Sequence, residues 1–484
     1  MELKEGEILD VPEILEIGDL FKESPKWDQI EECPESKHEE SSSLHENDEV
    51  SVNLDNVDEE NTVPEALPVI LESHRQILAQ VTLPFLAAGM GMVGAGVCLS
   101  IVQHWTVFEQ LPEVLILVPP LLGLKGNLEM TLASRMSTAA NMGEFKTRRG
   151  KFEIVFGNMA LLQVQAIVVG LLAAVIAFVM DIELTKSVQW NHLTLLAASG
   201  SVTASLASLI LGSITSAVII LSNMCNINPD NIATPIAGAL GDITALVILS
   251  VTASLFYSII GTHDWVYPVV CAVLISLLPI FIIIARRNKF TKDVLKHGWT
   301  PIIIAMLIQV TAGLILDIVA NRTKDVAIFQ PVVNGVAGNL VAIQASKMST
   351  FLHQVTKLGV LPAGMRIFLS PKTVFFSKEQ LSTTARSLMI LVVPGHLIFT
   401  YTISFAEQHG TSLHPLFILF YLVAVFIQIT IVIYCTSVLT HFFWSREKDP
   451  DNNTIPYMTA IGDFLGILFM GLVFEILRVM AVET

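Results

Sequence analysis

Long apolar segments separated by short polar loops fill the chain from about residue 80 onward. Eleven of these segments are long enough to cross a bilayer as a helix, which takes about 20 residues. They cover residues 80–102, 112–137, 153–180, 193–223, 232–259, 266–285, 300–320, 327–351, 387–406, 414–440 and 455–476. The pattern predicts an all-α integral membrane protein with eleven transmembrane helices.

Composition supports the same class. Hydrophobic residues make up 52% of the chain and charged residues 15%, a balance that differs from that of soluble domains. The net charge of -16 comes from one end, because residues 1–72 hold 23 acidic and 4 basic side chains. Segment 1–75 is also rich in Ser, so we expect a largely disordered cytoplasmic tail. An unidentified cytoplasmic protein is a candidate partner of this tail, and no nucleic-acid partner is expected.

The loops between the predicted helices alternate in charge. Basic residues concentrate in the second, sixth and eighth loops, at 146–151, 286–296 and 357–386, whereas the odd-numbered loops carry few. The positive-inside rule places the basic loops on the cytoplasmic side of the membrane. We therefore expect the N-terminus in the cytoplasm and the C-terminus outside, and we take the plasma membrane as the expected location.

Two parts of the sequence are near copies of each other. Residues 119–138 read PPLLGLKGNLEMTLASRMST, residues 331–350 read PVVNGVAGNLVAIQASKMST, and the two align at a constant shift. A second duplicated pair consists of a Pro, five further residues and a Gly-Asp, and it ends at Asp242 and Asp463. Internal duplication in a membrane protein places polar groups at matching depths, as an ion path requires.

The duplication divides the membrane part into a first half at 76–260 and a second half at 298–480, with a linking helix and a basic loop at 261–297. Each half holds five predicted helices. Because five is odd, a direct copy would insert upside down, and the sixth helix restores the orientation. We therefore predict two parallel five-helix repeats, related by a pseudo-twofold axis along the membrane normal, with a path on that axis.

Asp242 and Asp463 fall near the middle of the fifth and eleventh predicted helices. A carboxylate at the centre of a bilayer costs at least about 2.5 kcal/mol, so it is retained where it faces water, an ion or a partner. Each aspartate follows a Gly and lies seven residues after a Pro, which lets the helix open a carbonyl toward an ion. The alternative is a carboxylate that is protonated or paired with a buried base. We predict that both are metal ligands.

The duplicated stretches offer a second set of candidate ligands. Asn127 and Asn339 carry amide oxygens, while Gly126 and Gly338 are expected to interrupt the helices and free backbone carbonyls. Hard oxygen ligands suit Mg²⁺, Ca²⁺ or Na⁺ rather than zinc or copper. The alternative is close helix packing through small residues. The histidines and cysteines show no metal-ligand spacing, so a transition-metal site is not expected.

The two halves also differ at single positions. Glu129 stands four residues after Lys125 in the first half, and Val341 occupies the equivalent place in the second. Glu129 is either half of an internal ion pair or an extra carboxylate beside the path. Gln344 is present only in the second half and is a further candidate oxygen ligand.

The sequence resembles solute carrier family 41, the eukaryotic relatives of the bacterial MgtE magnesium channels. The resemblance covers about residues 75–480, and the stretches that carry it read GNLEMTLASRMSTAAN and NPDNIATPIAGALGD. It implies a pore between two five-helix units in which Asp242 and Asp463 hold a largely hydrated Mg²⁺. It also implies efflux of magnesium with Na⁺ as coupling ion. The large Mg²⁺-sensing region of the bacterial proteins has no counterpart in the acidic tail, so gating by such a region is not implied.

These observations predict a magnesium transporter that has no cofactor and is not an enzyme. A sodium-coupled exporter and a Mg²⁺ channel without sodium coupling both fit the residues. The rival class is an intramembrane aspartyl protease, which also uses two aspartates within the membrane. Such enzymes use two different aspartate contexts and a Pro-Ala-Leu stretch, whereas both aspartates here share a Gly-Asp setting and that stretch is absent. A scaffold or sensor that works through its tail is the third interpretation.

Overall fold

The computed structural model describes residues 72–102, 104–185, 190–320, 326–362, 364–377, 380–406 and 414–480. Within these ranges every regular element is a helix, as the apolar pattern predicts. They belong to a unit that spans Pro64–Thr484. The predicted tail lies outside the described residues except for positions 72–75, so its disorder stays a prediction.

Each predicted apolar segment falls on one long helix. These helices are α1 (His74–Val102), α3 (Pro112–Asn141), α4 (Arg148–Thr185), α5 (Trp190–Met224), α6 (Pro229–Tyr257), α7 (Val266–Arg287), α9 (Trp299–Ala320), α10 (Val326–Val355), α12 (Gln380–Ala406), α13 (Pro415–Ser445) and α14 (Pro450–Val479). Four short helices, α2 (Thr106–Gln110), η2 (Glu144–Lys146), α8 (Lys292–His297) and α11 (Pro371–Phe376), lie in the connections.

Eight of the described helices are long and apolar enough to cross a membrane, namely α1, α4, α5, α6, α7, α12, α13 and α14. This content is that of an integral multi-pass membrane protein. The total of eleven crossings stays a prediction, because α3, α9 and α10 are not among these eight.

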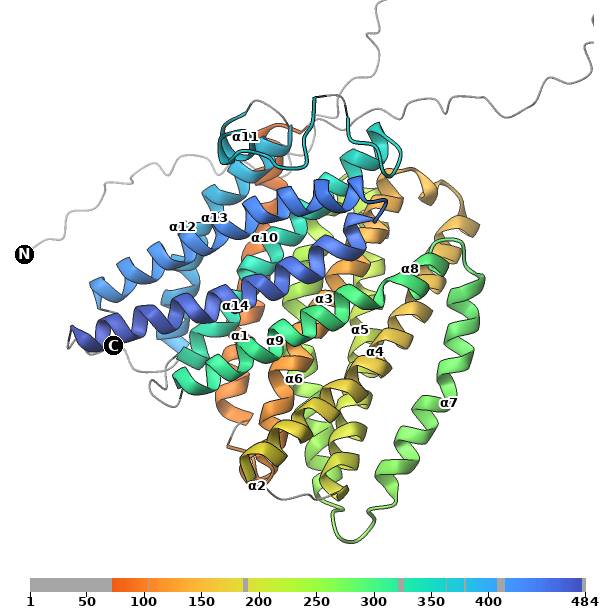
Figure 1. Cartoon of the computed structure of the whole chain (residues 1–484), viewed down its shortest axis with the longest axis vertical. Helices are drawn as coiled ribbons and strands as arrows, with labels where there is room; N and C mark the ends of the chain where they lie inside the picture. Colours follow the sequence, from red (N-terminus) through yellow and green to blue (C-terminus); the bar gives the residue numbers. More distant parts are fainter. Residues whose placement is uncertain are drawn as a thin grey trace, which may run out of the picture. The chain divides into compact units, whose positions relative to one another are not determined.

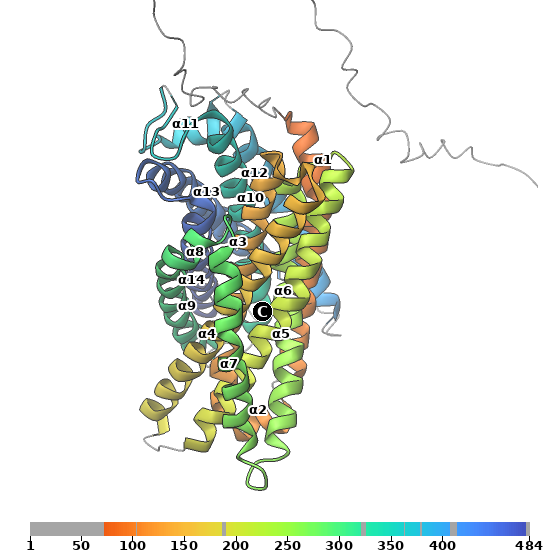
Figure 2. The same ribbon diagram turned by 90° about the vertical axis from the view of Figure 1, so that its right-hand side faces the viewer.

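The linking helix α7 lies at the margin of the helical unit. It packs against α4 and α5, and only 6% of its apolar window is buried. Figure 1 shows α7 at the right-hand edge, and Figure 2 shows it in front of α4 and α5. An apolar helix whose surface is covered so little by other helices is suited to contact with lipid.

The helices α6 and α14 begin with the same capping arrangement. The side chains of Asn228 and Asp449 accept hydrogen bonds from the backbone N–H groups of Asp230 and Asp451, and a Pro occupies the first helical turn in both cases. Ncap residues of this type satisfy N–H groups that have no partner within the helix. The caps fix where both helices start, and they place Asp230 and Asp451 in the first turn.

The expectation that Pro and Gly interrupt the helices is wrong. The helices α3 and α10 run without a break through the duplicated stretches, and α6 and α14 continue through Pro235 and Pro456. Neighbouring helices stabilise a helix that contains Pro in a membrane protein. A carbonyl near Asp463 does receive a side-chain partner, because Gln428 Nε2 donates a hydrogen bond to Gly462 O at 3.0 Å.

The helices that carry the duplicated stretches meet at the centre of the unit. Helix α3 contacts α6, α10 and α14, and helix α10 contacts α3, α6 and α14. Helices from the first half therefore pack against helices from the second half at this position, which is where a path between the halves would run.

Candidate cation site

A cavity of about 100 Å³ lies among α1, α3, α6, α9, α10 and α14, and both Asp242 and Asp463 line it. Each aspartate lies thirteen residues after the first residue of its helix. With a rise of 1.5 Å per residue this is about 20 Å from the helix start, close to the middle of a bilayer. The cavity thus joins the two carboxylates that the duplication singles out.

Asp463 is held by a side chain from α9. Gln309 Nε2 donates a hydrogen bond to Asp463 Oδ2 at 3.0 Å. Gln309 is buried and lies against Gly123 of α3, where a Cβ would overlap its amide group. The absence of a side chain at Gly123 therefore makes room for the residue that orients Asp463.

Asn127 lines the same cavity, and so does Gly338. The hydroxyl of Thr459 on α14 donates a hydrogen bond to Asn127 Oδ1. A side-chain hydroxyl of the second half thus orients an amide of the first half. The amide Nδ2 of Asn127 has no hydrogen-bond partner among the described residues.

The equivalent amide, Asn339, is buried but does not line the cavity. Its Oδ1 occupies the space that a Cβ on Gly238 would fill. Gly238 and Thr459 lie at equivalent positions, four residues before Asp242 and Asp463. The second half therefore has the Thr459 hydroxyl where the first half has Gly238. Without a hydroxyl to orient it toward the cavity, Asn339 packs against Gly238.

The structure does not bring the other three predicted ligands to the cavity. Glu129 is buried and lies against Gly241, with its Oε2 at 3.6 Å from the place of a Cβ there. Gln344 is directed toward α12 and α13, because its Nε2 lies 3.4 Å from both Leu381 O and Ser437 Oγ. The backbone of Gly126 is part of α3, and the residue is not among those that line the cavity.

Two further aspartates connect the halves near the starts of α6 and α14. Asp230 and Asp451 are fully buried, and each carboxylate accepts two hydrogen bonds from hydroxyls of the opposite half. The donors to Asp451 are Ser134 at 2.6 Å and Thr138 at 2.8 Å, and the donors to Asp230 are Ser346 at 2.7 Å and Thr350 at 3.0 Å. These six residues are called the carboxylate–hydroxyl brace below. Buried carboxylates that accept hydrogen bonds in this way are strong structural links.

Basic side chains lie beside the brace in both halves. Arg135 donates to Asn452 Oδ1 at 2.9 Å and to Asn158 Oδ1 at 3.2 Å. Its equivalent, Lys347, forms an ion pair with Glu72, and both side chains are 7% exposed. Glu72, two residues before the start of α1, is thereby fixed against α10.

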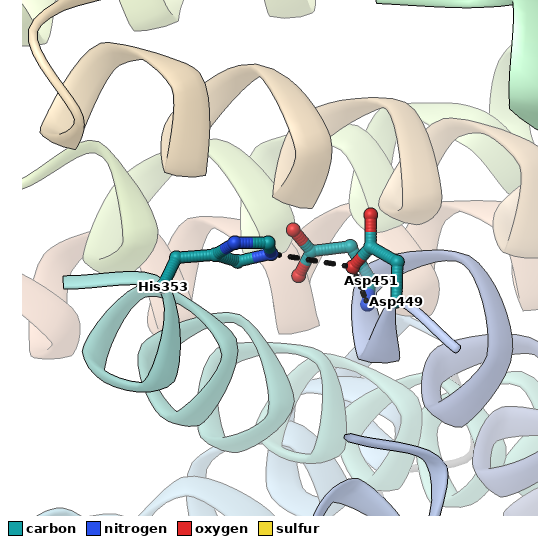
Figure 3. Close-up of side chains that lie close together, drawn as sticks. All are labelled: His353, Asp449 and Asp451. Carbon is teal, nitrogen blue, oxygen red and sulfur yellow. Dashed lines mark hydrogen bonds and ion pairs between the residues drawn. The ribbon is translucent and has the colours of Figure 1, made fainter. Parts of the chain in front are cut away.

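Figure 3 shows a group that sequence spacing did not reveal: the imidazole of His353 points toward the carboxylates of Asp449 and Asp451. His353 Nε2 lies 3.7 Å from Asp449 Oδ1, and one ligand atom from each residue lies within 4.8 Å of the others. The equivalent residues in the first half are Asn141, Asn228 and Asp230.

The environment of Asp449 favours its charged form. Burial raises the pKa of its carboxyl, but the His353 ring and the N–H of Asp451 outweigh this effect and hold the pKa below its ordinary value. The Asp451 oxygens accept hydrogen bonds from hydroxyls. The group therefore acts as a structural link between the end of α10 and the start of α14.

The sequence contains a repeated motif that marks the brace. A Pro-Asp-Asn occurs at 229–231 and again at 450–452, with the same shift of 221 positions that relates Asp242 to Asp463. Gln309 had no such signal, because its equivalent residue is Met92. The shift of 217 positions that relates these two also pairs Pro84 with Pro301.

The comparisons with known proteins show the family of the chain. The family model described as "MgtE: Divalent cation transporter" matches the chain twice, at residues 118–252 and 330–473, one match in each half. Rat solute carrier family 41 member 3 is 45% identical over 84% of this chain and 88% of its own length. Mouse solute carrier family 41 member 2 is 42% identical over 94% of this chain and 79% of its own. Human member 2 is 42% identical over 92% and 78%.

Among solved structures, a eukaryotic MATE transporter superposes on 83% of this chain and 95% of its own at 10% identity and a TM-score of 0.31. Nothing about the present fold is drawn from so low a score.

The membrane-spanning helices and the family match together define a membrane transporter of divalent cations. Within that class, the chain belongs to the MgtE-like solute carrier family 41. Its relatives are transporters, so the chain is a transporter and not an enzyme, and the protease interpretation is set aside.

Proposed function

We propose that the chain moves Mg²⁺ across the membrane through the cavity between its two halves, with Asp242 and Asp463 as the charged ligands. The observation that carries the proposal is that two carboxylates from different helices line one cavity, midway along those helices. A pair of half-buried carboxylates attracts a divalent cation and is stabilised by it.

The size of the cavity bears on how the ion is held. The cavity of about 100 Å³ is large enough to hold water molecules. Mg²⁺ requires six ligands in near-octahedral geometry and gives up water reluctantly. The proposed ion therefore keeps part of its water shell, and protein oxygens supply the other ligands. Asn127, whose oxygen Thr459 orients, is the proposed neutral ligand.

We also propose that the halves are parallel five-helix repeats around a pseudo-twofold axis along the membrane normal. Support comes from the reciprocal brace, in which each half donates hydroxyls to an aspartate of the other. The two separate family matches further support this arrangement. On this proposal all eleven long helices cross the membrane, with the N-terminus and basic loops in the cytoplasm.

Transport direction and coupling are the remaining parts of the proposal. We propose efflux across the plasma membrane driven by the sodium gradient, with a Mg²⁺ channel without sodium coupling as the alternative. The purified full-length protein in vesicles with an enclosed Mg²⁺ indicator tests both. Flux that depends on an imposed sodium gradient supports exchange, flux that ignores it supports the channel, and no Mg²⁺ flux under any gradient rejects the proposed function.

A further inference from the structure

The wall of the cavity contributed by the second half is more polar than the wall contributed by the first. Gln309 and Asn334 line the cavity from α9 and α10. Their equivalents in the first half are Met92 and Leu122, which line the same cavity with apolar groups. The two sides of the site are therefore chemically different, although the aspartates are the same.

Both amides present an oxygen that the surrounding residues do not use. Gln309 is 4% exposed and Asn334 is 5% exposed. No described residue donates a hydrogen bond to Gln309 Oε1 or to Asn334 Oδ1. A buried acceptor without a partner destabilises the fold, so two of them in the wall of a cavity that contains a carboxylate indicate a ligand that is positively charged or is a bound water.

The packing around each amide keeps its oxygen in place. Gln309 is fixed through its Nε2, which donates to Asp463, and by the close approach to Gly123. Asn334 lies against Gly466 of α14, where a Cβ would overlap its Oδ1. Glycine at both contact positions leaves room for an amide next to the cavity, where a larger residue would displace it.

We propose that Asp463, Gln309 and Asn334 form a one-sided cation subsite, so that the ion is held off the axis and against the second half. Asp463 supplies the charge, Gln309 positions that carboxylate and offers its own oxygen, and Asn334 adds a second neutral oxygen. Amide oxygens of this kind are ligands for hard cations or for their bound waters. This inference rests on the proposed Mg²⁺ transport and assigns unequal roles to the two aspartates.

The test replaces each amide by the residue that the first half has at the same place. Gln309→Met and Asn334→Leu keep the size of the side chain and remove the oxygen. Asn334→Asp retains an oxygen and adds a negative charge at the same position, and Met306→Leu is the control, because Met306 is a buried residue of α9 that does not line the cavity. The readout is the rate of Mg²⁺ flux in vesicles as a function of Mg²⁺ concentration.

We expect Gln309→Met and Asn334→Leu to raise the half-saturating Mg²⁺ concentration by roughly 10-fold or more, with a smaller change in maximal rate. Asn334→Asp should saturate at a lower Mg²⁺ concentration than the wild type, because it adds a negative charge to the subsite, whereas Met306→Leu should saturate at the wild-type concentration. The melting temperature in detergent without Mg²⁺ controls for folding, and the rise in that temperature on adding MgCl₂ should be smaller in both amide variants.

The inference is overturned if both amide variants fold, saturate at the wild-type Mg²⁺ concentration and show the wild-type rise in melting temperature on adding MgCl₂. That result leaves the proposed function unaffected. A wild-type protein that carries no Mg²⁺ in the same vesicles overturns the proposed function itself. If either amide variant melts without added Mg²⁺ far below the wild type, Asn334→Asp decides: saturation at a lower Mg²⁺ concentration than the wild type supports the subsite, and unchanged saturation contradicts it.

Discussion

The hydroxyls of Thr138 and Thr350 lie 3.3 Å apart, and these two residues are equivalent to each other in the duplicated sequence. Equivalent residues touch each other only where the axis that relates them passes. Thr138 and Thr350 lie near the ends of α3 and α10, while Asp242 and Asp463 share a cavity about 20 Å from the helix starts. One contact between equivalent residues and one cavity shared by equivalent residues, at different depths, support an axis that runs along the helices, as proposed for parallel repeats.

Removing both of these hydroxyls should loosen the contact between the halves. In the double variant Thr138→Val/Thr350→Val the side chains keep their shape, but Asp230 and Asp451 each lose one hydrogen bond. A buried carboxylate with a missing donor costs about 1–3 kcal/mol. We expect a lower melting temperature in detergent and a higher rate of Mg²⁺ flux at low Mg²⁺ concentration.

Thr311→Val is the control for the hydroxyl change, because Thr311 is exposed and its hydroxyl donates within its own helix. An unchanged melting temperature in the double threonine variant would show that the brace does not hold the halves together.

The ion pair between Glu72 and Lys347 should contribute to stability through its burial. Lys347→Met leaves the Glu72 carboxylate buried without its base, which costs about 3–5 kcal/mol. Glu72→Gln/Lys347→Met removes both charges and should melt at a higher temperature than Lys347→Met alone. A double-mutant cycle on melting temperatures measures this coupling.

The exposed pair of Lys289 and Glu144, with side chains 66% and 46% exposed, serves as the reference. Its cycle should give less than about 1 kcal/mol. Equal coupling energies in the two ion pairs would contradict a stabilising role for the buried pair of Glu72 and Lys347.

The charge on Asp449 predicts a dependence of stability on pH. Because the pKa of this carboxyl is lowered in the folded protein, its stabilisation is present above the ordinary aspartate pKa of about 3.9 and is lost as pH falls through the lower folded value. His353→Asn introduces the residue that the first half has at this position. Without the ring, the pKa of Asp449 should rise, so the loss of stability as pH falls should become smaller or reverse.

Melting temperatures of the wild type and of His353→Asn between pH 7 and pH 3 measure this shift. His263→Asn, at an exposed histidine in a loop, controls for the removal of a ring. Parallel curves for the wild type and His353→Asn would rule out the link between His353 and Asp449.

The sequence predicted the helices and the pair of aspartates because both depend on local patterns. Apolar segments and the repeated Gly-Asp are read directly from the chain, and the two aspartates share one cavity. Helix geometry explains why some candidates do not line the cavity. Gln344 lies six positions after Gly338, which does line it, and at about 100° per residue it points to a different face of α10.

The same geometry explains why Glu129 does not line the cavity. It lies two positions after Asn127, which is about 200° further around α3. The contribution of Gln309 to the site was not predictable in this way, because no motif marks it and its contact with Asp463 depends on how α9 packs against α14. Residues that act across a helix interface become visible only when the interface is known.

The central claim is that Asp242 and Asp463 together hold the transported ion. Mg²⁺ flux through vesicles that contain the double variant Asp242→Asn/Asp463→Asn tests it most directly, with Glu475→Gln as control, since Glu475 is a solvent-accessible carboxylate near the end of α14. Each variant is first checked for membrane insertion and for the wild-type elution volume in detergent. We predict that the double variant inserts normally and carries Mg²⁺ at the rate of empty vesicles, while Glu475→Gln carries it at the wild-type rate. A double variant that transports Mg²⁺ as fast as the wild type would contradict the account.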